Sequence, residues 1–586
     1  MTRQSVIAWT GRLVRSLDPG SPRWILFPVI ALCLFMLWIQ IQSLSVQILG
    51  EHNWRQADTY SVAYNFVHES ADFFHPRIDW TRGRSGIMGM EAPILPYIMA
   101  LFMSVLGDDA STGRLVVWAL AMLGIASGGL LLRRGQGRGL GMGFFLMLAL
   151  SPMALFELRQ IQPDGVVGML GLVAALFFWR SSERECAGDY WIGMAVFSTA
   201  VLIKGPGIFM APAMWLFSVC GGKGSLTSKV LRGIPFVIPL GLYLAWDQWA
   251  RHLNTAYNEG EVYFAIDYSW DGIKSALTDK GGLRNIFEFL LPCYVSNWCL
   301  APAVLLGFAA SFQREHVRMT WPFLAWLICC SFFVAAFSSR LHSHWYYADL
   351  LLAPVCYFGA VGLSQVFAIF TRPRDLDRPF EQSWVAIALL IVFALTTVVG
   401  GKLLVGPNVV AGSGPLKDHV WMGEVGTRLF VLAMLLAIPL ASLRWRSVTA
   451  IGLPLLFLAS WVMIPRAIHD VREVFDWRTR KSEWSEYSDS LDKVRSFANF
   501  YSTRADLFVV DIPNPWGLYV PLRKGWSDDT GTIDRQGLNH YRNKGARFLL
   551  HIADQALPKE LRDMKPLKAF PRWSLYCIDT NGCPPA

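Results

Sequence analysis

The chain has 586 residues, of which 53% are hydrophobic and 17% are charged, and its mean hydropathy is +0.35. Soluble domains carry about 25% charged residues, so this composition excludes an ordinary soluble globular protein. The net charge of +9 does not indicate nucleic-acid binding, because much of it falls in short loops between apolar segments, where Lys and Arg set helix orientation in a membrane.

The N-terminal region combines basic residues with a long apolar segment. Arg3, Arg12, Arg15 and Arg23 precede an apolar run over 24–49. A cleaved signal has a shorter apolar core and a small-residue cleavage site. We therefore interpret this run as a retained first span whose N-terminus is in the cytoplasm.

Apolar segments that approach the roughly 20 residues of a membrane-spanning helix recur along the chain. They are 24–49, 113–132, 139–158, 165–180, 191–204, 207–220, 233–250, 289–312, 320–338, 346–370, 384–405, 428–443 and 448–464. We predict an α-helical polytopic membrane protein with about 13 transmembrane helices. Cations gather in alternate loops, which supports this count and its orientation.

The first external loop, about 50–112, is long and contains two further helical patterns. From Asp58 to Val67 apolar side chains repeat at helical spacing, which is typical of an interfacial amphipathic helix. The segment 92–107 has only about 15 apolar residues after its first Pro, a length that favours a helix lying in the interface rather than a span.

The composition becomes that of a soluble domain after Pro465. The stretches "ADLFVVDI" (505–512) and "ARFLLHI" (546–552) are typical of buried strands, and 491–501 and 534–545 of helices, the second ended by Gly545. We predict a membrane domain over 1–465 and a small external α/β domain over 466–586. Cys577 and Cys583 form a disulfide there or remain two unpaired thiols.

Polar residues that suit one reaction gather on the predicted external side. Asp58 or Asp164 would serve as a base for an acceptor hydroxyl, and 92–106 with neighbouring spans would line a groove for a lipid. An anionic leaving group needs cations, and the candidates are Arg55, Arg159, Lys204 and Arg340. Together these features indicate group transfer from a lipid-linked phosphate.

The order of these motifs resembles the GT-C membrane glycosyltransferases, and among them bacterial relatives of the protein O-mannosyltransferases and of the lipid A aminoarabinose transferase. The matching stretches, within 24–370, are "WRQADTY", "MEAPILPYIMALFMSVLG", "LRQIQPDGVVGML", "LIKGP" and "HSHWYYADLLLAP". The resemblance implies a GT-C fold and transfer of a single sugar from a polyprenyl-phosphate donor, with inversion. It places this reaction on the periplasmic side of a bacterial inner membrane.

The resemblance also implies roles for individual residues. Asp58 would be the first-loop catalytic acid, Asp164 the second-loop acid, and Lys204 the donor-phosphate contact; the base remains open between Asp58, Asp164 and Glu91, because some relatives have a paired Asp-Glu that is missing here. Both aspartates also suit helix N-caps. Further substrate contacts are expected from Gln56, His342, His344, Tyr346 and Tyr347. We expect no cofactor and assign no metal ligand, and the need for a divalent metal is open.

Other functions remain as alternatives. An oligosaccharide ligase or polymerase would use a lipid-diphosphate donor, and a lipid or solute transporter would carry its charges near mid-membrane rather than at one boundary. The acceptor is expected to be an envelope lipid, polysaccharide or protein, with membrane lipids as the other partners.

Overall fold

The computed structural model describes residues 52–136, 138–222, 225–258, 300–337, 344–371, 481–512, 515–528, 535–552, 564–570 and 573–579, with isolated residues elsewhere. Most of the predicted first span and the predicted spans 384–405, 428–443 and 448–464 lie outside these residues. So do Arg340 and His342 and the predicted domain boundary at 465. The count of about 13 spans therefore stays a prediction.

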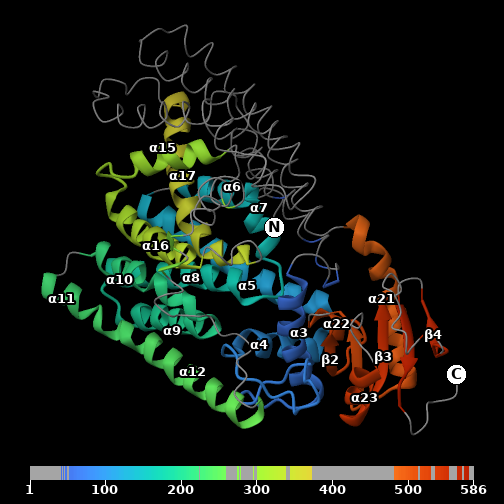
Figure 1. Cartoon of the computed structure of the whole chain (residues 1–586). Coiled ribbons are helices and arrows are strands. Elements are labelled where there is room, and N and C mark those ends of the chain that lie inside the picture. Colours follow the sequence, from blue (N-terminus) through green and yellow to red (C-terminus); the bar gives the residue numbers. More distant parts are fainter. Residues whose placement is uncertain are drawn as a thin grey trace, which may run out of the picture.

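Helices packed side by side form the larger part of the molecule (Figure 1). In chain order they are α3 (Asn53–His68), α4 (Ile94–Leu106), α5 (Ala110–Gln136), α6 (Arg138–Leu150), α7 (Pro152–Glu157), α8 (Pro163–Arg184), α9 (Ala187–Ile203), η2 (Gly205–Met210), α10 (Ala211–Cys220), α11 (Leu226–Leu231), η3 (Ile234–Phe236), α12 (Val237–Asn258), α15 (Ala301–Ala310), α16 (Val317–Ala336), η6 (Trp345–Ala348) and α17 (Asp349–Thr371). Helix α8 lies at the centre and contacts α5, α9, α10 and α17.

Five helices in the described part of the chain are long and apolar enough to cross a membrane. They are Ala110–Gln136, Pro163–Arg184, Leu226–Asn258, Val317–Ala336 and Trp345–Ser364. Each coincides with a predicted span, so these five predictions are confirmed. The chain is a multi-pass membrane protein.

The segment 139–158, predicted as one span, is two helices. Ser151 separates α6 from α7: its side chain accepts a hydrogen bond from the Ala154 amide and donates one to the Val295 carbonyl at 2.6 Å. Pro152 follows in the first turn of α7, where a missing N–H costs nothing. A single uninterrupted helix is therefore the wrong prediction here.

The two helices predicted in the first loop are present, but α3 lies in a different environment from the predicted one. Helix α4 buries Leu95, Met99 and Met103 and exposes Leu101 and Val105, as expected of a helix at an apolar boundary. Helix α3 begins at Asn53, earlier than predicted, and buries most of its length, polar residues included. Protein surrounds it, so it does not lie on the membrane surface as an amphipathic helix.

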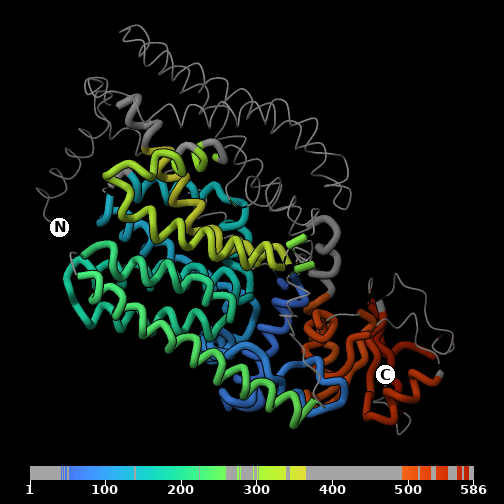
Figure 2. Tube along the Cα trace, turned by 60° about the vertical axis from the view of Figure 1, so that its left-hand side comes forward, coloured from blue at the N-terminus to red at the C-terminus, as the bar shows by residue number. Residues whose placement is uncertain are grey.

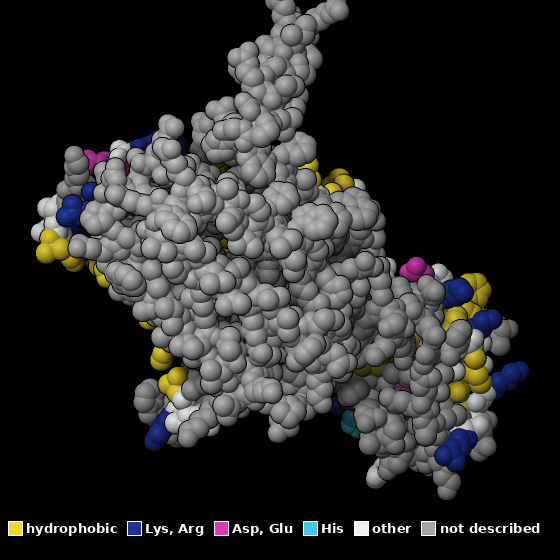
Figure 3. Space-filling view, turned by 90° about the horizontal axis from the view of Figure 1, so that it is seen from above, with side chains coloured by type: hydrophobic (Ala, Val, Ile, Leu, Met, Phe, Trp, Pro, Cys, Tyr) yellow, Lys and Arg dark blue, Asp and Glu magenta, His cyan; other side chains and the backbone are white. Residues whose placement is uncertain are grey.

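The C-terminal part forms an α/β domain beside α3, seen in two views in Figures 1 and 2. Its elements are α21 (Lys481–Tyr501), β1 (Leu507–Asp511), α22 (Trp516–Tyr519), β2 (Gly525–Asp528), α23 (Arg535–Asn543), β3 (Ala546–Ile552), β4 (Lys568–Ala569) and β5 (Trp573–Cys577). The sheet order is β2-β1-β3-β5-β4, with β1 parallel to β2 and β3. The predicted strands and helices of this domain are confirmed. Lys and Arg side chains are visible on this part of the surface (Figure 3).

The structure describes two details predicted for this domain, the glycine that ends α23 and the disulfide of Cys577. Gly545 follows α23 with a φ of +91°, a left-handed conformation that favours glycine and ends the helix. Cys577, at the end of β5, is disulfide-bonded, and its predicted partner Cys583 lies outside the described residues.

The domain is joined to the membrane part through α3 and the first loop. The Trp516 indole donates to the Ile48 carbonyl, and the rings of Tyr519 and Tyr60 meet edge to face at 5.3 Å. At the outer edge of β2, the Gly525 amide donates to the Asp79 carbonyl at 3.0 Å, and the Gly525 carbonyl accepts from the Arg82 amide at 2.9 Å.

Candidate active site

Four segments that are far apart in the sequence bring charged side chains together at one end of the helix bundle. The Glu91 carboxylate, ahead of α4, is 2.6 Å from Arg55 Nη2 of α3 and 3.1 Å from Lys204 Nζ at the end of α9. Lys204 Nζ also lies 3.5 Å from Asp164 Oδ1 at the start of α8. We call these four residues the charged cluster.

Backbone contacts explain how Lys204 and Glu91 meet. Helix α9 ends at Ile203, and the next residue, Lys204, has an extended backbone before Gly205 and Pro206 begin a 3-10 helix. The ring of Tyr243 lies 2.6 Å from where a Cβ of Gly205 would stand, so a larger residue there would have to displace this ring. The Ala92 amide donates to the Leu202 carbonyl at 3.2 Å, which ties the loop of Glu91 to the last turn of α9.

Helix α12 supports the same loop from the other side. The side chain of Asn254 accepts from the Gly89 amide at 2.8 Å and donates to its carbonyl at 3.0 Å. The Trp246 indole donates to the Met90 carbonyl. A Cβ on Gly89 would be 1.8 Å from the Ala250 carbonyl oxygen, so the loop packs directly on the helix backbone, two residues before Glu91.

Asp58 lies one turn beyond Arg55 on α3 and is 2% exposed. Its Oδ2 atom has no hydrogen-bond partner within the described part of the chain. Burial raises the pKa of Asp58 to about 8; Arg55 opposes the rise, while the negative charges of Glu91 and Asp79 add to it. Near neutral pH this carboxyl is therefore poised to exchange a proton.

Glu91 has the opposite electrostatic environment. Burial alone would raise its pKa, but Arg55 and Lys204 together lower it to about 2. Glu91 therefore stays ionised at any physiological pH and holds the two cations in place. The contrast with Asp58 gives the two carboxylates different tasks, since only Asp58 can take up a proton readily.

An aromatic wall stands beside the charged cluster. The Lys204 ammonium lies 5.9 Å and 5.8 Å from the ring centroids of Tyr346 and Tyr347, and His344 packs against both rings and against Trp54. A small cavity adjoins the cluster. It is lined by Asp164, Val167, Lys204, Pro206, Gly207, Phe333, Tyr347 and Leu350.

The structure thus brings together most of the residues selected from the sequence. Asp58, Glu91, Asp164, Lys204, Arg55, His344, Tyr346 and Tyr347 gather as described above. Gln56 accepts a hydrogen bond from the Ile161 amide at 3.4 Å and so holds the second loop against α3. Arg159 is buried in that second loop, with its guanidinium 5.5 Å from the Phe156 ring.

Four polar residues at this place were given no role in the sequence analysis. His52 Nε2 is 3.6 Å from Glu157 Oε1, and Gln162 donates to the same carboxylate at 2.8 Å. Asp349 is buried where α17 begins, and its Oδ2 lies 3.4 Å from the Cβ position of Gly165. Glu157 could have been noticed as an acid inside an apolar run. Asp349 stands at the start of a helix, where an Asp is most simply interpreted as a cap.

This arrangement can bind a phosphate and accept a proton within one site. Arg55 and Lys204 supply the donors that an anionic oxygen requires, and Asp58 supplies a carboxylate with a raised pKa. Within the part of the chain that the structure describes, no three His, Cys, Asp or Glu side chains are grouped as metal ligands.

Comparisons with known proteins agree with this architecture. Residues 90–249 match the dolichyl-phosphate-mannose-protein mannosyltransferase family. The structure is similar to ArnT from Cupriavidus metallidurans bound to undecaprenyl phosphate, with a TM-score of 0.55 and 14% identity over 96% of this chain and 99% of that chain. The apo state of the same ArnT gives a TM-score of 0.53 with 15% identity over the same shares.

No curated protein matches the chain in sequence. The likeness to ArnT extends over nearly the whole of both chains, which includes the membrane part and the C-terminal part. The chain therefore has a GT-C fold like that of ArnT, and its match to the dolichyl-phosphate-mannose-protein mannosyltransferase family covers residues 90–249.

Proposed function

We propose that this protein transfers a single sugar from a polyprenyl-phosphate donor to a hydroxyl group of an envelope lipid, polysaccharide or protein. The observation that carries the proposal is the convergence of Arg55 and Lys204 on one carboxylate, beside Asp58 and beside a wall of aromatic rings. The solved structure of ArnT with undecaprenyl phosphate supports the donor class.

In the proposed reaction the acceptor oxygen attacks the anomeric carbon of the donor sugar while the bond from that carbon to the phosphate oxygen breaks. The anomeric configuration inverts, and the polyprenyl phosphate leaves with the bonding electrons. Arg55 and Lys204 stabilise the negative charge on the leaving phosphate. Asp58 takes the proton of the acceptor hydroxyl.

The choice of Asp58 as base follows from the electrostatics of the three candidate acids. Glu91 is held ionised by two cations and is a weak base for this reason. Asp164 lies 3.5 Å from Lys204 and helps to hold it for the phosphate. The pKa of Asp58 is raised to about 8, close to the pH at which a cell works, where a general base is most effective.

The aromatic wall fits the same reading. Tyr346, Tyr347 and His344 flank the ammonium group that would face the donor phosphate. Flat rings of this kind offer a sugar an apolar face together with polar edges. We assign the donor sugar to this side of Lys204, and we assign the reaction to the periplasmic face of a bacterial inner membrane.

The test is a transfer assay with purified protein in detergent or nanodiscs, radiolabelled polyprenyl-phosphate sugars and envelope extracts. Wild-type protein is expected to move label into a lipid, glycan or protein fraction, whereas Asp58→Asn is expected to lose at least about a hundredfold of the rate. A diphosphate-linked donor run in parallel separates this proposal from an oligosaccharide ligase. Transfer by Asp58→Asn at the wild-type rate would refute the assignment of the base.

A further inference from the structure

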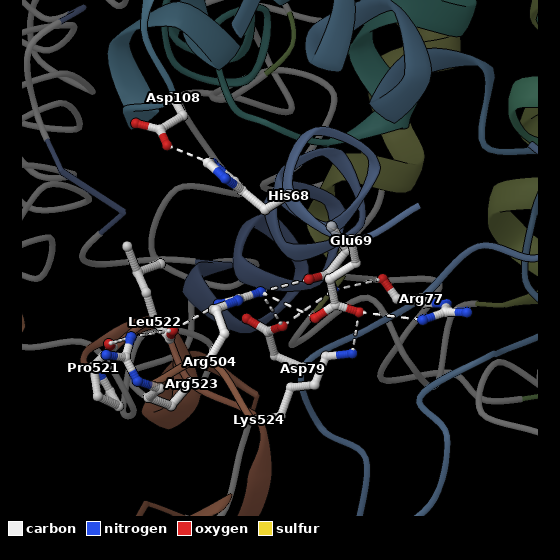
Figure 4. Close-up of polar contacts among 11 residues, drawn as sticks. His68, Glu69, Arg77, Asp79, Asp108, Arg504, Pro521, Leu522, Arg523 and Lys524 are labelled. Atoms are coloured by element: carbon white, nitrogen blue, oxygen red, sulfur yellow. Dashed lines mark hydrogen bonds and ion pairs between the residues drawn. The ribbon is translucent and has the colours of Figure 1, made fainter. Parts of the chain in front are cut away.

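A second group of charged residues links the C-terminal domain to α3 (Figure 4). Arg504 Nη2 donates to the side-chain oxygen of Asn65 and to Asp79 Oδ1, the latter at 3.1 Å. Asn65 Nδ2 donates to the same Asp79 oxygen at 3.1 Å. Lys524 pairs with Glu69 at the end of α3. We call Arg504, Lys524, Asn65, Glu69 and Asp79 the domain link.

Contacts within the C-terminal domain also hold Arg504 in place. Arg504 Nη1 donates to the Leu522 carbonyl at 2.6 Å, so the guanidinium is fixed to the loop that leads into β2. Its carbon lies 4.5 Å from the centroid of the Tyr64 ring on α3. Asp79 is 4% exposed, and a carboxylate buried to this degree requires a charged partner.

The link lies on the same side of α3 as the proposed base. Asn65 follows Asp58 by seven residues, which is close to two helical turns, so both side chains project from one face. Asp58 and Asp79 line the same narrow hollow, whose remaining walls are Ala57, Tyr60, Ser61, Trp80, Pro515 and Tyr519. Pro515 and Tyr519 belong to the C-terminal domain, so this domain forms part of the immediate surroundings of Asp58.

We propose that Arg504 of the C-terminal domain is a positioning residue for Asp58, because it fixes Asp79 and Asn65 and thereby sets the orientation and the charge environment of α3 at the base. The proposal rests on the proposed function for the role of Asp58. It makes the C-terminal domain a structural part of the reaction site.

The charges around Asp58 determine in which direction its pKa should change when the domain link is altered. On its own helix it is influenced by Arg55, and from the first loop by Glu91 and Asp79. Burial raises the pKa of Asp79, and Arg504, Asn65 and Lys524 oppose that rise. The link favours the charged form of Asp79, and that negative charge adds to the raised pKa of Asp58. Asp79→Asn removes that charge and is expected to lower the pKa of Asp58.

The experiment compares the full-length wild type with Arg504→Ala, Arg504→Lys, Asp79→Asn and the matched control Arg542→Ala. Arg542 belongs to the same domain but donates to the Ile578 carbonyl, away from α3. Transfer rates from a radiolabelled polyprenyl-phosphate sugar to an envelope extract are measured across pH. Hydrogen exchange of the α3 amides in the same proteins reports on the link without any need for transfer.

Arg504→Ala is expected to lower kcat by about tenfold or more, because small displacements of a catalytic group cost that much. The KM for the donor should stay unchanged, since Arg504 bonds to Leu522, Asn65 and Asp79 and not to Lys204, the proposed donor-phosphate contact. Exchange should increase along Asp58–Glu69, and Arg504→Lys should recover part of the rate. Asp79→Asn should move the midpoint of the pH profile to lower pH.

Two results would overturn the proposal. One is an Arg504→Ala variant whose kcat and α3 exchange equal those of Arg542→Ala. The other is an Asp79→Asn variant with an unchanged pH midpoint. Absence of transfer by the wild type would instead refute the proposed function, and the exchange measurement would still decide whether Arg504 holds α3.

Discussion

Arg55 and Glu91 form an ion pair of 2.6 Å between α3 and the loop ahead of α4, and Lys204 joins the same carboxylate oxygen at 3.1 Å. One acid thus holds two cations that would otherwise repel each other. Without it, both would be buried next to each other with less compensation. The fold around the site depends on this acid as much as the chemistry does.

Glu91→Gln should therefore destabilise the protein. Removing one partner of a buried ion pair costs about 3–5 kcal/mol, and thermal unfolding in detergent measures the loss. Glu183→Gln is the matched control, because its pair with Arg134 at 3.7 Å is partly exposed and is worth about 0–1 kcal/mol. The double variant Glu91→Gln/Lys204→Gln should lose less unfolding free energy than the sum of the two single variants. A loss equal to that sum would contradict the interpretation that Glu91 holds both cations.

The rate of transfer should rise with pH through about 8, the pKa of Asp58. Below that pH the carboxyl is protonated and cannot take the acceptor proton; above it the carboxylate is free to do so. A pH profile of the single-turnover rate measures the midpoint. Asp58→Asn should lose the rise, and a wild-type profile that is flat between pH 6 and 9 would be inconsistent with Asp58 as base.

Lys204→Met should weaken binding of undecaprenyl phosphate by about tenfold or more, since a charge-assisted hydrogen bond to phosphate is lost. Lys204→Arg should retain part of the affinity. Binding of the labelled lipid to purified protein is the measurement. Lys229→Met, in α11 at the other end of the bundle, removes the same charge and should bind the lipid as the wild type does.

Gly89→Ala should impair transfer without touching a charged residue. The added Cβ would meet the Ala250 carbonyl oxygen at 1.8 Å, so the loop must move away from α12 and carry Glu91 with it. The expected result is a loss of transfer together with a lower unfolding temperature. Gly241→Ala on α12, where a Cβ meets nothing within 4 Å, should behave as the wild type; equal behaviour of both variants would show that the contact is unimportant.

The sequence indicated the charged cluster because each member is a polar residue at the end of an apolar segment. Glu91, Asp164 and Lys204 each stand at a helix boundary, and the alternation of charged loops placed these boundaries on one side. The length and hydrophobicity of the apolar segments likewise predicted the five long apolar helices. These features are local, so a single sequence contains them.

Other features depend on contacts between distant residues and have no local pattern. Arg504 reaches Asp79 across 425 positions, and Trp516 reaches Ile48 across 468. No spacing in the sequence indicates either contact. The break at Ser151 was hidden because a Ser-Pro pair in an apolar run also fits a kinked span. The contact between His52 and Glu157 was not predicted, because it joins two segments that are far apart in the sequence.

The backbone pairing of Gly525 with Asp79 and Arg82 covers the outer edge of β2. Uncovered strand edges invite pairing with other chains. A fragment that begins near residue 481 would lack this cover, and we expect it to self-associate when it is produced alone. In the intact chain the first loop is synthesised before the sheet, so the backbone of Asp79 and Arg82 is available to cover β2 when the sheet forms.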